Sequence, residues 1–171
     1  MNDLLLLAAL LDGPKHGYAL KKSIGLITGK SEMHNNLVYP LLKRFVVAGW
    51  VSRRKAAGER GQTREVYSLT GKGRQMLLNR LAEFTQKEAA SGEAFCLRAG
   101  LFGVLSAEKR REILEQRDKW LVTRAERLAM VAKNMPLDGW AGETVGFLRK
   151  QAEAERKWLE RLRKREKKST R

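Results

Sequence analysis

Five polar residues between positions 35 and 44 carry side chains suited to contact with a polyanion. They are Asn35, Asn36, Tyr39, Lys43 and Arg44, and large apolar residues alternate with them. The amides and the phenol can donate and accept hydrogen bonds, whereas Lys43 and Arg44 supply positive charge. Residues three or four positions apart share one side of a helix. The segment therefore predicts a helix with one face for the core and another for a charged partner.

The charge of the whole chain favours the same kind of partner. The 171 residues carry a formal net charge of +16, which attracts phosphate-rich polymers through electrostatics and counterion release. A charged membrane surface would use this charge equally well. Hydrophobic residues make up 43% and charged residues 32% of the sequence, which indicates a folded, helix-rich protein rather than a disordered one.

Three helices are predicted at the N-terminal end by the spacing of apolar residues. They span Leu4 to Leu11, His16 to about Ile27, and Asn35 to about Ala48. His16 is expected to act as a hydrogen-bonding group at the entry of its helix. Gly49 is expected to cap the third helix, because glycine readily adopts the left-handed conformation that ends a helix. The predicted core face of this helix consists of Leu37, Leu41, Leu42, Phe45 and Val46.

After Gly49 the pattern changes to short β-prone runs. Residues 50–54 and 64–69 flank two glycines that suit a hairpin tip, and Thr70 is placed to cap a fourth helix. Basic residues surround the hairpin, namely Arg53, Arg54, Lys55, Arg60 and Arg64. Three helices, a hairpin and a fourth helix make the order of a winged helix-turn-helix. In such a domain the third helix can enter the major groove of DNA, and Arg60 and Arg64 of the hairpin would contact phosphates.

Three motifs also occur in the order and spacing of a known family. They are HGYAL at 16–20, LVYPLLKRFVVAGWV at 37–51 and TREVYSLTGKGRQML at 63–77. Over about residues 4 to 85 the chain thereby resembles the PadR-like transcriptional regulators. The resemblance implies a DNA-binding winged helix with C-terminal helices that form a dimer, and in some such regulators an aromatic small molecule bound between the two parts. Tyr18 and Tyr67, within these motifs, are expected to be structural.

From about residue 91 the pattern is almost uniformly helical. Leu114, Leu121, Leu128 and Met135 recur every seven residues, and a second apolar register from 141 to 162 is broken only by Glu155. Two amphipathic helices result, and their apolar seams favour packing against each other and against a second protomer. We therefore expect a DNA-binding domain at 1–90 and a dimerisation and effector domain at 91–171. A helical hairpin on a monomer is the alternative.

Other residues of the second half have less specific patterns. Phe95, Trp120 and Trp140 are the residues predicted to line an effector pocket, although an aromatic residue on an amphipathic helix usually belongs to the core. Cys96, the single cysteine, is expected to be a buried thiol. The sequence contains no Cys and His cluster with metal-ligand spacing, no phosphate-binding loop and no nucleophile beside a base. We predict no metal, no cofactor and no enzymatic activity.

Together these patterns predict a mainly α protein, with a small β-hairpin wing, that regulates transcription. We expect a homodimeric repressor that binds a palindromic operator and is released by a small molecule. The apolar run from Leu4 to Leu11 is too short to span a bilayer, and we expect a cytoplasmic protein. An architectural protein that binds nucleic acid without sequence preference is the main alternative, and a winged helix used only for protein assembly is another. The ratio of affinities for a palindrome and for random duplex separates them.

Overall fold

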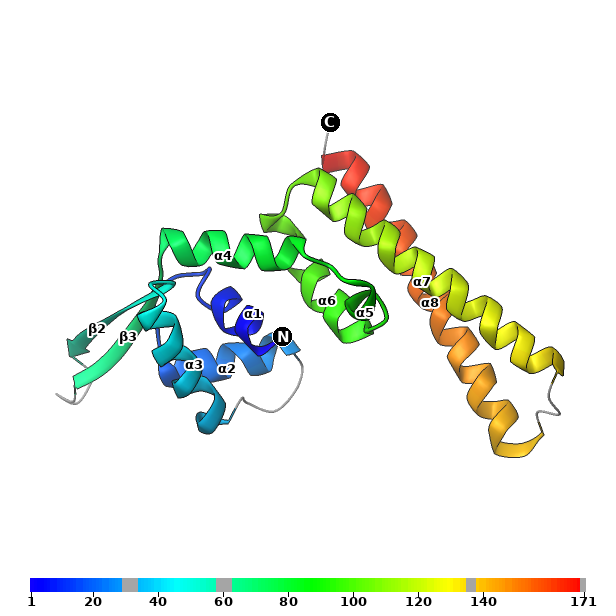
Figure 1. Ribbon diagram of the computed structural model, residues 1–171, viewed down its shortest axis with the longest axis horizontal. Coiled ribbons are helices and arrows are strands. Elements are labelled where there is room, and N and C mark those ends of the chain that lie inside the picture. Colours follow the sequence, from blue (N-terminus) through cyan, green and yellow to red (C-terminus); the bar gives the residue numbers. More distant parts are fainter. Residues whose placement is uncertain (29–33, 58–62, 135–137, 170–171) are drawn as a thin grey trace. The chain divides into compact units, whose positions relative to one another are not determined.

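The computed structural model describes residues 1–28, 34–57, 63–134 and 138–169 (Figure 1). The chain divides into two compact units, Met1–Glu83 and Phe84–Arg171. Residues 84–90, which the sequence pattern placed in the first domain, belong to the second unit, where helix α5 (Gln86–Ala89) packs against α6 (Gly92–Gly100) and α7 (Ala107–Asn134). Within the described ranges, none of the helices combines the length and the apolar character needed to cross a bilayer.

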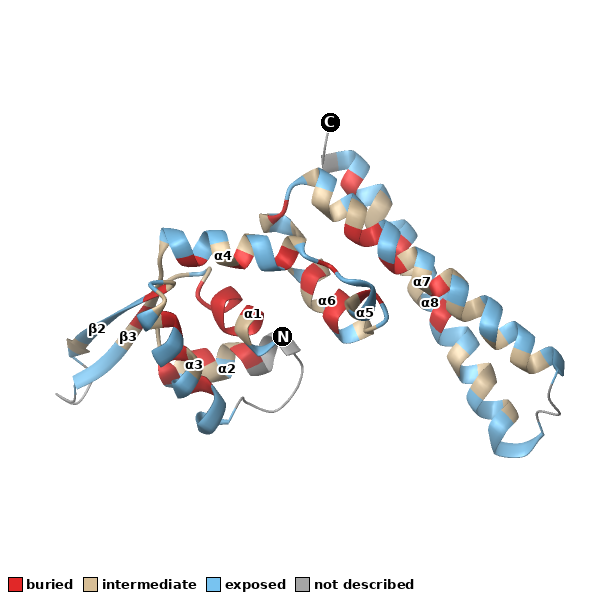
Figure 2. Ribbon diagram, viewed as in Figure 1, coloured by how far each residue is buried: buried red, intermediate tan, exposed pale blue. Residues whose placement is uncertain are grey.

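The first unit is a winged helix-turn-helix, as the element order predicts. Its helices are α1 (Asn2–Ala8), α2 (Gly17–Thr28), α3 (Asn35–Val47) and α4 (Gly71–Ala82), and its strands are β1 (Lys15–His16), β2 (Val51–Ala57) and β3 (Thr63–Leu69). The buried core, red in Figure 2, collects one apolar face from each helix. It includes Leu4, Leu6, Leu7, Leu20, Ile24, Val38, Leu42, Phe45, Leu77 and Leu81. Burial of these side chains drives the helices together.

The sheet contains one strand that the sequence pattern did not predict. Its order is β1-β3-β2 and both pairings are antiparallel. The wing hairpin runs in register from Val51 opposite Leu69 to Ala57 opposite Thr63. Strand β1 is only two residues long, with Lys15 opposite Tyr67 and His16 opposite Val66. Two residues are too few to show the period-two alternation by which a strand is recognised.

The end of α3 confirms the role predicted for Gly49. This residue has φ +73°, a conformation that glycine adopts without a steric penalty. Its N–H bonds to the Val46 carbonyl at 3.0 Å, and the Trp50 N–H bonds to the Phe45 carbonyl at 2.9 Å. The rings of Phe45 and Trp50 also pack with centroids 5.3 Å apart. This is a Schellman motif with its hydrophobic contact, and it directs the chain from α3 into the wing.

The core face of α3 differs from the predicted face. Val38, Leu42 and Phe45 are fully buried, whereas Leu37 is 45% exposed. The buried positions follow the spacing of four and three residues, and each residue step turns a helix by about 100°. Leu37 therefore lies beside the core face rather than within it, and its prediction as a core residue is wrong. Val46 and Leu41 are half-buried at the edges of this face.

Helix α4 begins directly against the turn that leads into the wing. The hydroxyl of Thr70 accepts a hydrogen bond from the Gly73 N–H at 3.0 Å and donates one to the Gly49 carbonyl at 2.7 Å. Thr70 is thus the predicted N-cap. A Cβ atom at Gly73 would overlap the carbonyl oxygen of Trp50. The position requires glycine because the backbones of α4 and the wing are in direct contact.

The second unit consists of short helices packed on a long helical hairpin. The short elements are α5, α6 and the 3₁₀ turn η1 (Phe102–Val104), and the hairpin pairs α7 with α8 (Gly139–Ser169). Leu114 and Leu121 of the predicted seven-residue repeat are buried on α7, and Ala152 and Leu159 are buried on α8. The two long helices therefore pack against each other within one chain, as their apolar seams predict.

Three arginines of the second unit each bind a glutamate from a buried or half-buried position. Arg117 is 2% exposed and binds both carboxylate oxygens of Glu155 at 2.7 Å as well as the Ala89 carbonyl. This pair explains why Glu155 interrupts the apolar register of α8. Arg98 is 1% exposed and binds Glu88 at 2.7 Å, and Arg110 binds Glu166. Because these guanidinium groups have hydrogen-bonded counterions, they can be buried.

Candidate nucleic-acid interface

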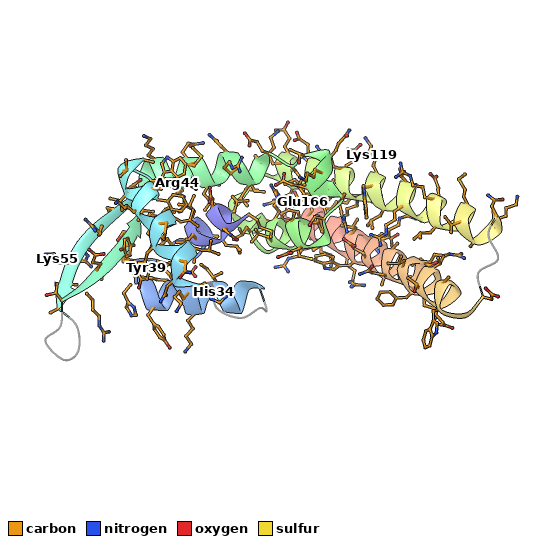
Figure 3. All side chains as sticks on the ribbon, turned by 60° about the horizontal axis from the view of Figure 1, so that its bottom comes forward. His34, Tyr39, Arg44, Lys55, Lys119 and Glu166 are labelled. Atoms are coloured by element: carbon orange, nitrogen blue, oxygen red, sulfur yellow. The ribbon has the colours of Figure 1, made fainter. Side chains whose placement is uncertain are left out.

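All five residues predicted to contact a polyanion from α3 are exposed to solvent. Asn35 and Asn36 lie in its first turn, and Tyr39 and Lys43 follow at helical spacing on exposed positions. Figure 3 shows Tyr39 and the wing residue Lys55 in the first unit. The side opposite the core face also carries Val47, which is 83% exposed. Val47 was not predicted at this surface, because its apolar side chain carries no group that could bind a polyanion.

Arg44 is exposed but its charge is already paired. One of its terminal nitrogens lies 3.1 Å and 3.0 Å from the two carboxylate oxygens of Asp3, at the start of α1. The two residues are 41 positions apart in the sequence. Asp3 therefore balances the charge of Arg44, which distinguishes Arg44 from Lys43.

The wing carries a row of exposed basic side chains. Arg54 and Lys55 lie on β2, and Arg64 lies on β3. Arg53 donates a hydrogen bond to the Glu65 carboxylate across the hairpin at 3.0 Å. Among the described residues, Arg54, Lys55 and Arg64 have no acidic partner, so their positive charge faces solvent. Arg60, the other predicted phosphate contact, lies outside the described residues.

A groove of about 330 Å³ joins α3 to the wing. It is lined by Tyr39, Lys43, Val46, Val47, Arg53, Glu65 and Tyr67. At its base the hydroxyl of Tyr67 donates to Glu65 at 2.7 Å. Burial raises the pKa of Tyr67 to about 12, and the Glu65 carboxylate contributes in the same direction. Tyr67 therefore remains a neutral donor. Its burial agrees with the structural role expected for it.

The three residues predicted to line an effector pocket lie in different environments. Phe95 is fully buried, and its ring packs edge-on against the ring of Trp158 at 5.4 Å. Trp140 is 90% exposed near the start of α8. Trp120, in contrast, lines a cavity of about 650 Å³ within the second unit. The structure does not bring the three residues together.

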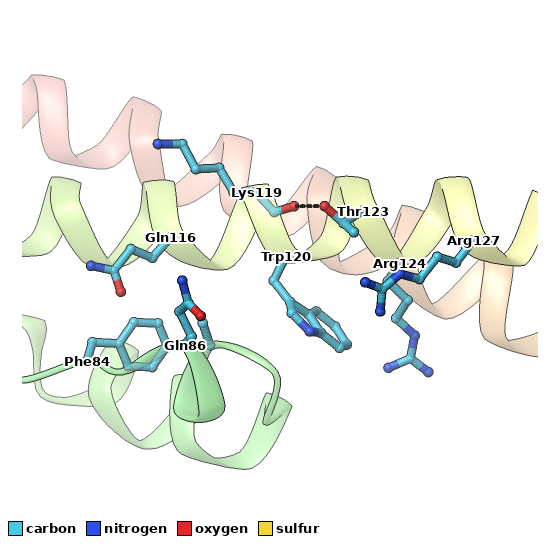
Figure 4. A pocket seen from close by; sticks show the side chains of 9 residues that line it. Phe84, Gln86, Gln116, Lys119, Trp120, Thr123, Arg124 and Arg127 are labelled. Carbon is cyan, nitrogen blue, oxygen red and sulfur yellow. Dashed lines mark hydrogen bonds between the residues drawn. The ribbon is translucent and has the colours of Figure 1, made fainter.

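The cavity beside Trp120 combines aromatic, amide and basic groups (Figure 4). Its lining consists of Phe84, Gln86, Ala89, Gln116, Lys119, Trp120, Thr123, Arg124 and Arg127. The guanidinium groups of Arg117 and Arg124 lie 4.6 Å and 5.1 Å from the Trp120 ring centroid. Both are within the range of a cation–π contact. The cavity therefore suits a molecule with polar or negative groups beside an apolar part.

Cys96 is exposed, so the prediction of a buried thiol is wrong. Desolvation still raises the pKa of this thiol, and the nearby Glu155 carboxylate adds to the effect. A raised pKa keeps the thiol protonated and lowers its reactivity. Over residues 1–28, 34–57, 63–134 and 138–169, the structure contains no group of His, Cys, Asp and Glu side chains arranged to hold a metal ion.

Comparison with protein families identifies the first unit. Residues 6–79 match the model of the "Transcriptional regulator PadR-like family". A PadR family transcriptional regulator from Eggerthella lenta is 30% identical over 47% of this chain and 68% of its own, with a TM-score of 0.42. A Thermoplasma acidophilum protein described as a transcriptional regulator is 33% identical over 46% of this chain and 75% of its own, with a TM-score of 0.43. The chain belongs to the PadR-like family of transcriptional regulators.

The PadR-like match contains α2, α3 and the wing, and lies wholly in the first unit. Membership of the family is shown by the sequence matches and not by the TM-scores, which are below 0.5. The structure of Bacillus subtilis PadR in complex with operator DNA aligns with 94% of this chain and 95% of its own, at 18% identity and a TM-score of 0.47. A search of curated proteins gave no match.

Proposed function

We propose that this PadR-like regulator binds duplex DNA in a sequence-specific manner through α3 and the wing. The observation that carries the proposal is that exposed cations without a described acidic partner lie on both α3 and the adjacent wing. Among the described residues, Lys43, Arg54, Lys55 and Arg64 have no such partner. Asn35, Asn36 and Lys43 would face base edges in the major groove, and Tyr39 would contact DNA beside them. Arg64, together with Arg60, would contact phosphates, and Arg44 would join them on leaving Asp3.

The proposal is tested by selecting bound duplexes from a random pool and measuring affinity for the selected and for random sequences. A sequence-specific regulator binds the selected duplex at least a thousandfold more tightly at physiological salt, on the order seen for specific DNA-binding proteins. An architectural protein would bind both duplexes almost equally, with the same steep salt dependence. A winged helix used only for protein assembly would bind every duplex weakly.

We also propose that the second unit forms the homodimer. Its hairpin leaves Met130, Trp140 and Phe147 between 63% and 90% exposed, and a second protomer would cover such side chains. Two copies of α3 would then read half-sites about one helical turn of DNA apart, which requires a palindromic operator. Analytical ultracentrifugation tests this directly. Trp140→Ser with Phe147→Ser should shift the dimer toward the monomer, whereas Lys133→Ser, also exposed on the hairpin, should leave it unchanged.

The cavity beside Trp120 is our candidate for the effector site of a repressor. Its volume of about 650 Å³ lies in the range of small-molecule sites. A bound effector would contact Trp120 and so change the fluorescence of the protein. A screen for molecules that release DNA should find compounds whose effect is lost in Trp120→Ala and kept in Lys133→Ala. An effect that is equal in both variants would place the effector elsewhere.

A further inference from the structure

A second groove lies in the first unit where the start of α2 meets α3 and β3. It has a volume of about 380 Å³ and is lined by His16, Gly17, Tyr18, Tyr39, Arg64, Glu65 and Tyr67. We propose that this groove binds one phosphate of the DNA backbone, with Tyr18, Tyr39 and Arg64 as the contacting residues and Gly17 as a positioning residue. The proposal rests on the proposed function and adds Tyr18 and Gly17 to it.

The exposure of Tyr18 is the first observation. Tyr18 is 62% exposed, although it was expected to be structural. A ring that lies mostly in water gains little free energy from burial. The ring is nevertheless held in place. It stacks on His16 with centroids 6.4 Å apart and planes at 11°, and the Lys21 ammonium lies 5.9 Å from its centroid. Tyr18 is therefore an ordered, exposed phenol beside positive charge.

The donors in the groove are of the kind that binds an anion. In the described part of the chain, the hydroxyls of Tyr18 and Tyr39 and the guanidinium of Arg64 have no hydrogen-bond partner. Two hydroxyl donors and a guanidinium match the oxygens of a phosphate. A phosphate also has no sequence identity, so these contacts would fix the position of the protein on DNA without reading bases.

The one carboxylate in the groove is already engaged. Glu65 accepts hydrogen bonds from Arg53 at 3.0 Å and from the Tyr67 hydroxyl at 2.7 Å. Its negative charge is thus balanced by Arg53 on the opposite strand. Arg64 remains as the cation of the groove without such a partner among the described residues, and the local balance of charge favours an anion.

Gly17 determines where the Tyr39 hydroxyl lies. A Cβ atom at Gly17 would lie 2.8 Å from this hydroxyl oxygen and 3.0 Å from the ring carbon Cε1. Any other residue at position 17 would therefore displace the end of Tyr39. The displacement costs little stability, because only the end of an exposed side chain must move. Gly17 thus brings the phenol of α3 to the start of α2, next to Tyr18.

The experiment measures binding of duplexes in which single phosphates of the selected operator are replaced by uncharged methylphosphonates. For the wild-type dimer, replacement at one phosphate in each half-site should weaken binding about tenfold or more, the effect of losing a hydrogen bond to a charged group. Tyr18→Phe should bind the unmodified operator and random duplex more weakly by the same factor. In this variant, replacement at that phosphate should have a smaller effect than in the wild type, because the contact of the Tyr18 hydroxyl is already lost and only those of Tyr39 and Arg64 remain.

A matched pair of glycine variants tests the positioning role. Gly17 and Gly71 are the first residues of α2 and α4, but a Cβ atom at Gly71 meets nothing within 4 Å. Gly17→Ala should reduce affinity as Tyr39→Phe does and keep the thermal midpoint, whereas Gly71→Ala should bind as the wild type does. Asn36→Ala should retain the full methylphosphonate effect.

Two results would overturn the inference. One is an identical methylphosphonate profile for Tyr18→Phe and the wild type, and the other is normal affinity of Gly17→Ala. Failure of the proposed function would look different, because the wild-type protein would then prefer no duplex over any other.

Discussion

The two units carry the same net charge of +8, but over the residues described only the second unit buries arginines. In the second unit Arg98 and Arg117 are buried and bound to carboxylates. The Arg98 pair joins α6 to α5, and Arg117 joins α7 to α8 and to the Ala89 carbonyl at the end of α5. In the first unit Arg54, Lys55 and Arg64 point to solvent and, over the residues described, have no acidic partner. Net charge therefore does not locate a polyanion site. Exposed cations without a described acidic partner lie in both units, among them Lys164, Arg165 and Lys167 of α8, and the wing is distinguished from these by its place beside α3.

The largest effect is expected when a buried pair of the second unit is broken. Arg117→Met leaves Glu155 without its counterion and should destabilise this unit by about 3–5 kcal/mol. Urea unfolding monitored by circular dichroism measures the loss. Arg111→Met removes an exposed arginine of the same helix and should change stability by less than about 0.5 kcal/mol. Equal stability of both variants would show that the buried ion pair does not stabilise the second unit.

The stability of the first unit should depend on close backbone packing rather than on ion pairs. Gly73→Ala places a methyl group against the Trp50 carbonyl and should cost about 1–3 kcal/mol, the usual effect of overpacking. Gly71→Ala, two residues earlier in the same helix turn, is its control because the space beside it is open. A wild-type unfolding midpoint for Gly73→Ala would mean that α4 and the wing are not in direct contact.

Residues that read bases should differ from residues that contact phosphates. Asn36→Ala should change the preference among duplex sequences, by about 1–3 kcal/mol at the position that Asn36 contacts. Arg64→Ala should weaken binding to every sequence by a similar factor. Fluorescence anisotropy with single-base variants of the operator measures both. The division of roles is wrong if the two variants lose the same affinity on every duplex.

The smallest effect is expected for the exposed ion pair of α3. Asp3→Ala frees Arg44 from the carboxylate at 3.0 Å and should change stability by less than about 1 kcal/mol, as exposed ion pairs do. Affinity for DNA should rise slightly, because Arg44 no longer has to leave a partner. A lower affinity would indicate that Asp3 positions Arg44 for DNA rather than competing for it.

The parts of the fold that could be predicted are those determined by residues close together in the sequence. The Gly49 cap, the Thr70 cap and the wing hairpin depend on residues close together in the sequence, and all three were predicted correctly. His16 is likewise a helix-entry group, because its Nδ1 accepts a hydrogen bond from the Ala19 N–H at 3.2 Å. The two amphipathic helices of the second unit followed from their seven-residue repeat.

Other features of the structure depend on contacts between residues far apart in the sequence, and the spacing of apolar residues does not reveal such contacts. Arg44 could be placed on an exposed face, but its pairing with Asp3 requires α1 and α3 to be packed together. The cavity at Trp120 is formed by residues from 84 to 127, and a single helix pattern could not separate Trp120 from the exposed Trp140. Exposure of Cys96 depends in the same way on how α6 packs.

The central claim is tested most directly by the salt dependence of DNA binding in two double variants of equal charge. Lys55→Ala with Arg64→Ala removes two cations of the wing, and Lys133→Ala with Arg127→Ala removes two exposed cations of the hairpin. If the wing contacts phosphates, the first variant should reduce the slope of log affinity against log salt by about two, and the second should leave it unchanged. Equal slopes for the two variants would contradict the account, because net charge alone would then determine binding.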